Sequence, residues 1–430
     1  MKNLFKTLMA LMLLGVPVVM QAQLKRSDDF RDKYKLKEAV VLSRHNIRAP
    51  LSGNGSALGN LTPHEWTQWS SAPSELTLRG GALETMMGQF FRKWLVDAGL
   101  FPENYVPTAD EVNVYANSMQ RTIATARYFT SGFMPVGGLV VNHRFVPSKM
   151  DPVFNPQLTK VSPEFKAEAM KEIAAMGGKK GIIGINEELT PNYILIAEVL
   201  DLKDSPAGKS GTKAFDDYNT QIILERNKEP GMTGSLKDAN SASDAFILQY
   251  YEEPDSVAAA FGKTLTREQW QEIAKIKDVY GDVLFTAPIV AVNVAHPLLQ
   301  YMYDEIESPD RKFTFLVGHD SNIASVTAAL GVLPYDLPNA IEKKTPIGSK
   351  LVVEKWVGPD GEEYGALNLV YQSVDQLKNM SLLDLDNPPM VVSLKLDGLQ
   401  ENADGLYKMA DLEARFLQAI RAYDAIPDTL

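Results

Sequence analysis

Three short apolar segments, each followed at once by polar side chains, constrain the fold of this chain most strongly. Residues 38–42 precede Arg44 and His45, residues 112–116 precede Asn117, and residues 313–317 precede His319 and Asp320. Each segment is short and rich in Val, Phe or Tyr, which is typical of a buried strand. A helical repeat of apolar residues, 83–95, follows the first segment. Strands that alternate with helices favour an α/β layered fold with a mostly parallel sheet flanked by helices.

The polar residues at the ends of these segments predict a binding site. In open α/β sheets, ligands bind beyond the carboxyl ends of the strands. We therefore expect the three polar clusters to converge, although they are far apart in the chain. Ser118 and Ser321 can each cap a helix that begins directly after them.

The middle of the chain has a different pattern. From residue 151 to 288 strand signals are sparse, and helical stretches such as 164–176 and 264–277 alternate with expected loops such as 203–212 and 229–243. We interpret this region as a smaller, mostly helical cap domain inserted into the α/β domain. The α/β domain then comprises residues 23–150 and 289–430, with strands expected at 350–356 and 367–371.

The first 22 residues resemble a secretory signal. Lys2 and Lys6 precede an apolar stretch, 8–19, that is too short to span a bilayer comfortably, and Ala22 is a plausible cleavage point. We therefore expect a periplasmic or secreted protein that is not held in a membrane after cleavage. The chain has no cysteine, so disulfides cannot contribute to its stability.

The net charge of −11 makes a nucleic acid an unlikely class of partner. An anion site in such a chain must be a local positive pocket in a negative body. Hydrolysis of a phosphate monoester would need such a pocket, together with a nucleophile that faces phosphorus and a proton donor for the leaving oxygen. The strand ends offer positive charge in Arg44, Arg48 and Arg121, a nitrogen nucleophile in His45, a further donor in His319 and a proton in Asp320.

Each of these residues alone has an ordinary interpretation. A single arginine is most often a surface charge, and Asp320 could simply stabilise the start of a helix. His64, His143 and His296 receive the ordinary interpretation, and His64 has no second histidine at zinc-protease spacing. The joint occurrence of phosphate-compatible groups at three strand ends favours the site.

These residues also carry a family resemblance. Arg44-His45-Asn46-Ile47-Arg48-Ala49-Pro50 resembles the Arg-His-Gly-x-Arg-x-Pro signature of the histidine acid phosphatases, and Gly318-His319-Asp320 resembles the second motif of that family. Further matching segments are 117–122, 244–252 and 345–348. Asn46 replaces the usual glycine; asparagine tolerates a left-handed backbone better than most residues, and the glucose-1-phosphatase branch of the family is similar here.

The resemblance implies a role for each residue. His45 would attack phosphorus and form a phosphohistidine, while Arg44, Arg48, Arg121 and His319 would bind the phosphate. Asp320 would protonate the leaving alcohol and then activate the water that hydrolyses the intermediate. The substrate would be a small phosphate ester, and neither a cofactor nor a metal is expected. Relatives usually have disulfides, which this chain lacks.

Three functions stay open. The first is a secreted phosphatase for glucose 1-phosphate and related sugar phosphates. The second is a phytase-like inositol polyphosphate phosphatase, against which an acid at the lip of the site would discriminate; Glu252 is the candidate for that specificity residue. The third is a phosphate-ester binding protein without catalysis, which the presence of both His45 and Asp320 disfavours. No oligomeric state is predicted.

Overall fold

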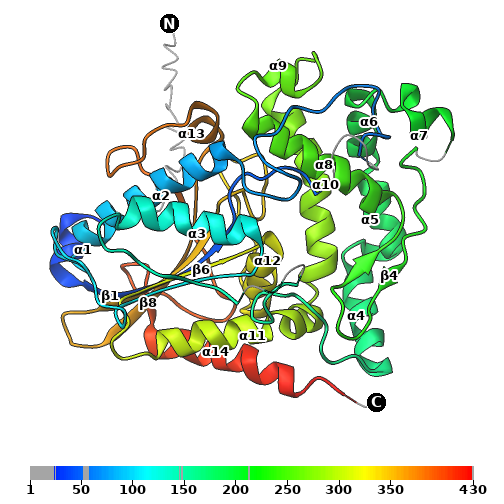
Figure 1. The fold of residues 1–430 in the computed structure, drawn as a ribbon. Coiled ribbons are helices and arrows are strands. Elements are labelled where there is room, and N and C mark those ends of the chain that lie inside the picture. The colour runs from blue at the N-terminus through cyan, green and yellow to red at the C-terminus, as the bar shows by residue number, and fades with distance from the viewer. Residues whose placement is uncertain are drawn as a thin grey trace, which may run out of the picture.

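A computed structural model describes residues 24, 26–51, 58–144, 146, 149–211 and 214–428. The expected signal segment, residues 1–22, lies outside the described residues. Figure 1 shows a central sheet covered by helices on both faces, with the helices of residues 163–285 gathered at one side of it. The expected α/β layered fold is therefore confirmed, while the domain boundaries at residues 151 and 288 stay a prediction.

The central sheet is mixed rather than purely parallel. β1 pairs in parallel with β6, β6 with β2, and β2 with β3, whereas β7, β8, β9 and β10 extend the sheet in antiparallel pairs. Its strands are, in spatial order, β10 (Tyr407–Lys408), β8 (Glu363–Tyr371), β7 (Lys350–Val357), β1 (Lys35–Arg44), β6 (Phe313–Gly318), β2 (Val112–Ala116) and β3 (Val141–Asn142), with β9 (Met390–Ser393) paired to β8.

The sequence of β1 shows why the sheet is covered on both faces. Successive side chains of a strand point to opposite faces. Ala39 and Val41 pack into the core on one face, and Val40 and Leu42 into the core on the other. The first face is covered by α1 (Asp28–Lys33), α2 (Leu78–Asp97) and α3 (Gln120–Phe133), and the second by α11 (Pro288–Ile306), α12 (Asp320–Ala329) and α14 (Met409–Asp424). A strand that is buried on both faces consists of consecutive apolar residues, and residues 39–42 have this pattern.

The region expected to form the cap is largely helical. Its elements are α4 (Pro163–Ala175), α5 (Ile182–Glu188), α6 (Thr190–Val199), α7 (Pro206–Lys209), α8 (Ser235–Glu252), α9 (Ser256–Ala259) and α10 (Arg267–Phe285), the 3-10 turns Gly178–Lys180 and Leu202–Asp204, and a hairpin of β4 (Ile222–Ile223) and β5 (Gly231–Met232). One further helix, α13 (Val374–Asn379), packs against this region.

Two expectations about this region were wrong. Residues 203–212 were expected to form a loop, but they include α7 and most of the second 3-10 turn. Residues 229–243 were also expected to form a loop, but α8 already begins at Ser235. Small polar residues predict loops because their side chains compete with the backbone. Here Leu236, Ala239 and Ala242 are buried in the core, so tertiary packing outweighs that local preference.

The two helix caps predicted at serines were also wrong. α3 begins at Gln120 after Met119, and α12 begins at Asp320 after His319. The side-chain oxygen of Asn322 accepts the backbone N–H of His319 at 2.9 Å, so that asparagine closes the first turn of α12 instead. Both helices nevertheless start at the ends of β2 and β6, and their positive N-termini face the same edge of the sheet.

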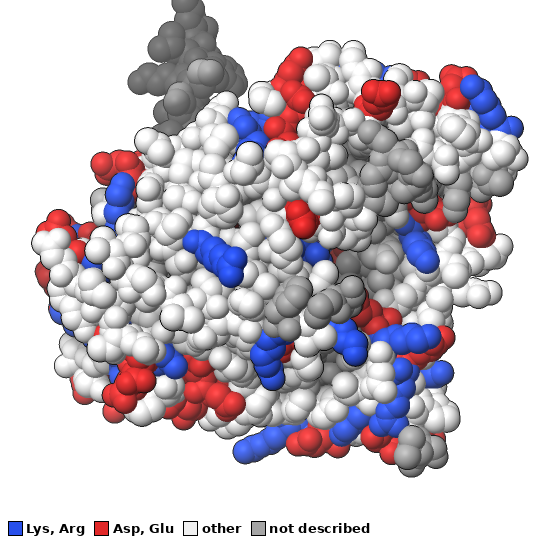
Figure 2. Space-filling view, in the orientation of Figure 1, with Lys and Arg blue, Asp and Glu red and all other residues white. Residues whose placement is uncertain are grey.

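In Figure 2, Lys and Arg are interspersed with Asp and Glu over the visible face of the molecule. No single helix in the described part of the chain has the length and hydropathy to cross a bilayer; α10 and α11 pass that test only as a pair, bent by 83°.

Candidate active site

The loop that carries His45 is fixed by backbone hydrogen bonds on both sides. β1 ends at Arg44, opposite Gly318 at the end of β6. The N–H of His45 donates to the carbonyl of Gly318 at 3.1 Å, and its carbonyl accepts from the N–H of Gly348 at 3.2 Å. The imidazole is 3% exposed. Two neighbouring strand ends and the 345–348 segment therefore hold this side chain at the carboxyl edge of the parallel strands.

The hydrogen bonds of His45 determine which ring nitrogen is free. Nδ1 lies 2.9 Å from the carbonyl oxygen of Asn46. A carbonyl can only accept, so Nδ1 carries a proton. Burial, and then the positive charge of Arg121, hold the pKa of His45 well below its usual range. The neutral ring therefore has an unprotonated Nε2, which is the form that a nucleophile requires.

A buried ion pair of Glu84 and Lys350 anchors the loop of His45 through the side chain of Asn46. The side-chain amide of Asn46 donates to Glu84 at 2.9 Å, and Glu84 pairs with Lys350 at 2.8 Å. The side chains of Glu84 and Lys350 are both 0% exposed. Gly348 has a φ of +66°, and a Cβ there would lie 2.7 Å from the amide nitrogen of Asn46. Asn46 thus anchors the turn through its side chain, where the family signature has glycine.

The three arginines predicted for the site converge, and each is buried. Arg44 donates to Glu342 at 2.5 Å and to the carbonyl of Thr345 at 2.6 Å. Arg48 donates to Asp244 at 2.9 Å. The Nε atoms of all three have no hydrogen-bond partner among the described residues, and Arg121 differs because its Nη1 has none either.

Arg121 therefore has unused donors in a buried place. It is 8% exposed, and burial lowers its pKa to about 10, which leaves it charged at neutral and acidic pH. An unsatisfied buried donor costs about 1–3 kcal/mol, and more when it is charged. An anion that accepts from Nε and Nη1 would remove this cost.

His319 lies beside both His45 and Arg121. The two imidazole rings are 5.4 Å apart between centroids, and Nδ1 of His319 is 3.5 Å from Nη2 of Arg121. Burial, and then Arg121, keep the pKa of His319 well below its usual range, so this ring is neutral as well. Two neutral imidazoles and three guanidiniums thus surround one position at the edge of the sheet.

Asp320, the predicted proton donor, begins α12 and is paired with a lysine that the sequence had not singled out. Nζ of Lys277 lies 2.7 Å from Oδ2 of Asp320, and Nη2 of Arg44 lies 3.5 Å from the same oxygen. Burial opposes ionisation, but Lys277 and Arg44 outweigh it and hold the pKa of Asp320 well below its ordinary value. The carboxyl side chain is 38% exposed and reaches the cavity.

Lys277 comes from the interior of α10, whose first turn is fixed by a capping box of Thr266 and Gln269. It also lies 3.8 Å from Glu342, the buried acid that binds Arg44. Lys277 thus joins the helical region to the strand ends through Asp320 and Glu342.

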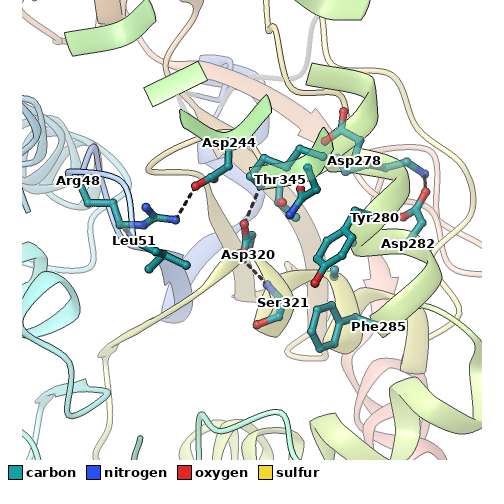
Figure 3. A pocket seen from close by; sticks show the side chains of 15 residues that line it. Arg48, Leu51, Asp244, Asp278, Tyr280, Asp282, Phe285, Asp320, Ser321 and Thr345 are labelled. Atoms are coloured by element: carbon teal, nitrogen blue, oxygen red, sulfur yellow. Dashed lines mark hydrogen bonds and ion pairs between the residues drawn. The ribbon is translucent and has the colours of Figure 1, made fainter. Parts of the chain in front are cut away.

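A cavity of about 160 Å³ opens beside these groups, between the ends of the strands and α8 and α10 (Figure 3). Arg48, Lys277 and Asp320 line it, and Tyr280 and Phe285 lie next to each other on the side of α10. Asp244, Asp278, Asp282 and Lys344 also line it. Each cation of this lining already has a carboxylate: Arg48 has Asp244, Lys277 has Asp320 and Lys344 has Asp282.

Glu252, the predicted specificity residue, is joined to the loop of His45 through Thr77, whose hydroxyl lies 3.3 Å from the carbonyl oxygen of Ile47. It ends α8, two helical turns beyond Asp244, and accepts a hydrogen bond from Thr77 at 2.7 Å. Burial raises its pKa. It is not among the residues that line the cavity beside Asp320. Asp244 is the acid of α8 that does line the cavity.

The structure thus gathers Arg44, His45, Arg48, Arg121, His319 and Asp320, while the specificity role of Glu252 stays a prediction. Sequence reasoning missed Lys277, Glu84, Lys350 and Glu342. Glu84 had a detectable signal, because it is a single charge three residues before Met87 on the apolar face of its helix. Among the described residues, no group of three or more His, Asp or Glu side chains could hold a metal ion.

The chain is similar to known phosphatases and phytases over most of its length. The model of the histidine phosphatase superfamily, branch 2, matches residues 35–371. Glucose-1-phosphatases from Salmonella typhimurium and Providencia rettgeri are each 39% identical, over 93% and 92% of this chain and 96% and 94% of their own lengths. The apo form of a Hafnia alvei phytase superimposes with a TM-score of 0.83 and 27% identity, covering 91% of this chain and 98% of the phytase.

Proposed function

Because the chain belongs to the histidine phosphatase superfamily, branch 2, and is therefore a phosphatase, we propose that it hydrolyses sugar phosphates such as glucose 1-phosphate through a phosphohistidine on His45. The 39% identity to two glucose-1-phosphatases supports this substrate class. The observation that carries the chemistry is the buried Arg121, with two unused donors beside the neutral rings of His45 and His319.

The proposed reaction has two steps. Nε2 of His45 attacks phosphorus, the bond from phosphorus to the leaving oxygen breaks, and Asp320 gives that oxygen a proton. Water then attacks the phosphohistidine and gives a proton to Asp320, so that phosphate leaves and His45 is free again. Arg44, Arg48, Arg121 and His319 hold the phosphoryl oxygens, where negative charge is stabilised in the transition state.

The ion pair of Asp320 and Lys277 bears on where the catalytic proton comes from. Lys277 keeps Asp320 ionised in the free enzyme. A phosphate monoester has a second pKa of about 6, so below that pH most of the substrate carries one proton. A complex of ionised Asp320 with this monoanion contains the same number of protons as protonated Asp320 with the dianion. The substrate monoanion can therefore bring the proton that Asp320 gives to the leaving oxygen. We therefore expect turnover to be favoured below the second pKa of the substrate.

The cavity favours a small leaving group without further phosphates. Its volume of about 160 Å³ is below the roughly 300–1,000 Å³ of pockets for drug-sized ligands. Its cations are already paired with carboxylates. Additional phosphates on a substrate would therefore meet carboxylates and few unpaired cations. The ring of a sugar can instead pack against Tyr280 and Phe285.

Initial rates on glucose 1-phosphate, p-nitrophenyl phosphate and phytate, with EDTA present throughout, test the proposal. We expect the highest kcat/KM on the sugar phosphate and no loss of activity in EDTA. His45→Ala is the control for contaminating phosphatases. A clear preference for phytate would replace the sugar phosphate with the second candidate, which the likeness to the Hafnia alvei phytase favours. Binding of all three without turnover would leave the third candidate, a binding protein.

Two matched variants separate the candidates for the specificity residue. Asp244→Asn removes a negative charge from the cavity and frees Arg48, so we expect it to raise the ratio of phytate to glucose 1-phosphate turnover. Glu252→Gln tests the lip acid predicted from the sequence in the same assay. A rise only in the Glu252 variant would move the specificity determinant to the end of α8.

We also propose a periplasmic or secreted location, based on the basic and apolar pattern of residues 1–22. N-terminal sequencing of the protein from a cell fraction outside the cytoplasm should begin at Gln23. Uncleaved protein confined to the cytoplasm would contradict this assignment.

A further inference from the structure

The orientation of one buried amide near the site can be deduced from its partners. Asn117 follows β2 and is 0% exposed. Its side-chain oxygen accepts the backbone N–H of Ser118 at 2.7 Å and that of Asp151 at 2.8 Å. A backbone N–H can only donate, so two donors fix the oxygen at this end of the amide. The side-chain nitrogen must then face the other way, where it lies 2.7 Å from Nε2 of His319.

This orientation determines the tautomer of His319. An amide nitrogen can only donate, so Nε2 has to accept and cannot carry a proton. The ring is neutral, and its single proton therefore lies on Nδ1. That nitrogen lies 3.5 Å from Nη2 of Arg121, which is also a donor. Two N–H groups thus converge, and an anionic oxygen between them would accept from both.

We propose that Asn117 is a positioning residue that holds His319 in the Nδ1–H tautomer, so that this nitrogen donates to the phosphoryl group. The inference rests on the proposed function for the identity of the anion. The tautomer itself can be measured without any substrate.

The cost of the wrong tautomer is large. With the proton on Nε2, His319 would present a lone pair to a phosphoryl oxygen instead of a donor. Removal of one donor from an oxyanion-binding site typically lowers kcat by roughly 10²–10³-fold. We expect a loss of that size when the tautomer is reversed.

Asn117→Asp reverses the tautomer and conserves the shape. One carboxylate oxygen can still accept from Ser118 and Asp151, while the other now faces Nε2 as an acceptor and demands a proton there. His319 can then donate from Nδ1 only after the ring gains a second proton. Three cations that face His319 oppose this second protonation: Arg121 on α3, Arg48 in the loop after β1 and Arg44 on β1. Asp320 on α12 favours it, and the neighbouring His45 is neutral.

The expected kinetic result is a change in the pH profile. In Asn117→Asp, kcat on p-nitrophenyl phosphate should fall roughly 10²–10³-fold at neutral pH and recover as the pH falls and the ring becomes doubly protonated. Asn293→Asp is a matched control, because Asn293 is also 0% exposed and its oxygen also accepts a backbone N–H, that of Thr159, but its nitrogen donates to the carbonyl of Lys160 and not to an imidazole. The control should keep the pH profile of the wild type.

The decisive readout is ¹⁵N NMR of the imidazole nitrogens, since the chain has only five histidines. His319→Gln identifies the signals of His319. We expect a protonated Nδ1 and an unprotonated Nε2 in the wild type, and a protonated Nε2 in Asn117→Asp. A protonated Nε2 in the wild type, or an Asn117→Asp variant with an unchanged pH profile, would overturn the inference. If the variant does not fold, the wild-type spectrum alone still decides the tautomer.

Failure of the proposed function has a different signature. In that case the wild type would show the expected nitrogen spectrum but no phosphatase turnover on the three substrates. Turnover with the opposite tautomer would instead leave the function intact and remove the role of Asn117.

Discussion

The buried pair of Glu84 and Lys350 allows a quantitative test of how the nucleophile loop is supported. Lys350 has two acceptors, Glu84 at 2.8 Å and the carbonyl of Gly348 at 3.0 Å. Lys350→Met removes the only cation paired with Glu84 among the described residues and leaves a buried carboxylate with the amide of Asn46 as its donor. Removing one partner of a buried ion pair typically costs about 3–5 kcal/mol.

The double variant should cost less than this single change. Glu84→Gln with Lys350→Met removes both charges at nearly constant volume and keeps an acceptor for the amide of Asn46. Replacing a whole buried pair is often close to neutral. We therefore expect Glu84→Gln alone and Lys350→Met alone each to lower the free energy of unfolding by about 3–5 kcal/mol, and the double variant to lower it by less than either.

Urea unfolding followed by tryptophan fluorescence measures all four proteins of this cycle. Midpoints should shift at a constant m-value, because the surface exposed on unfolding does not change. The activity of the double variant should exceed that of Lys350→Met, since it leaves no unpaired carboxylate next to Asn46. Independent sites add within about 0.5 kcal/mol. Additive losses across the cycle would refute the reasoning that these two charges act as one buried unit under His45.

Four further outcomes follow from the site. His45→Ala should abolish turnover, and only the wild type should trap an acid-labile, base-stable phosphoryl adduct; an acid-stable adduct would contradict a phosphohistidine. Asp320→Asn should slow phosphoenzyme formation from glucose 1-phosphate about 10²–10⁴-fold and from p-nitrophenyl phosphate far less, because a nitrophenolate leaves without a proton; equal losses would exclude proton donation. Arg121→Ala should both raise the Kd of inorganic phosphate and lower kcat, so an unchanged enzyme would remove it from the site. Lys277→Met should raise the pKa of Asp320, which Lys277 holds down, so that this carboxyl takes up its proton at a higher pH; carboxyl ¹³C titration against Asp320→Asn measures it, and an unmoved pKa would assign the effect to Arg44.

The strand ends were predictable because two local patterns coincide there. The first pattern is a short apolar run, which predicts each of the strands β1, β2 and β6. The second is a group of polar residues directly after each run, which must lie at the carboxyl end of that strand. These two patterns are enough to predict that His45 and His319 share one site, and the register of Arg44 opposite Gly318 confirms it.

The supporting residues could not be predicted in the same way. Lys277 lies inside an amphipathic helix, where a lysine is normally solvated, and its pairing with Asp320 depends on how α10 packs against the strand ends. Lys350 is the first residue of β7. It contacts Glu84 on α2 only because both side chains are buried under the turn of Asn46. Glu252 was chosen from its position after two tyrosines, but helical periodicity alone does not tell which acid of α8 faces the cavity. Asp244, two turns earlier, does.

The place of β1 in the sheet has a consequence for the order in which the molecule is made. β1 is the first strand to leave the ribosome, yet both of its neighbours, β6 and β7, come from residues 313–357. At roughly 5–20 residues per second, its first partner follows on the order of 15–60 s later. Throughout that interval the segment 35–44 has no strand to pair with and the catalytic pocket cannot exist. If the chain is exported as proposed, β1 would enter the translocation machinery without its partner strands, and activity would arise only after nearly the whole polypeptide had crossed.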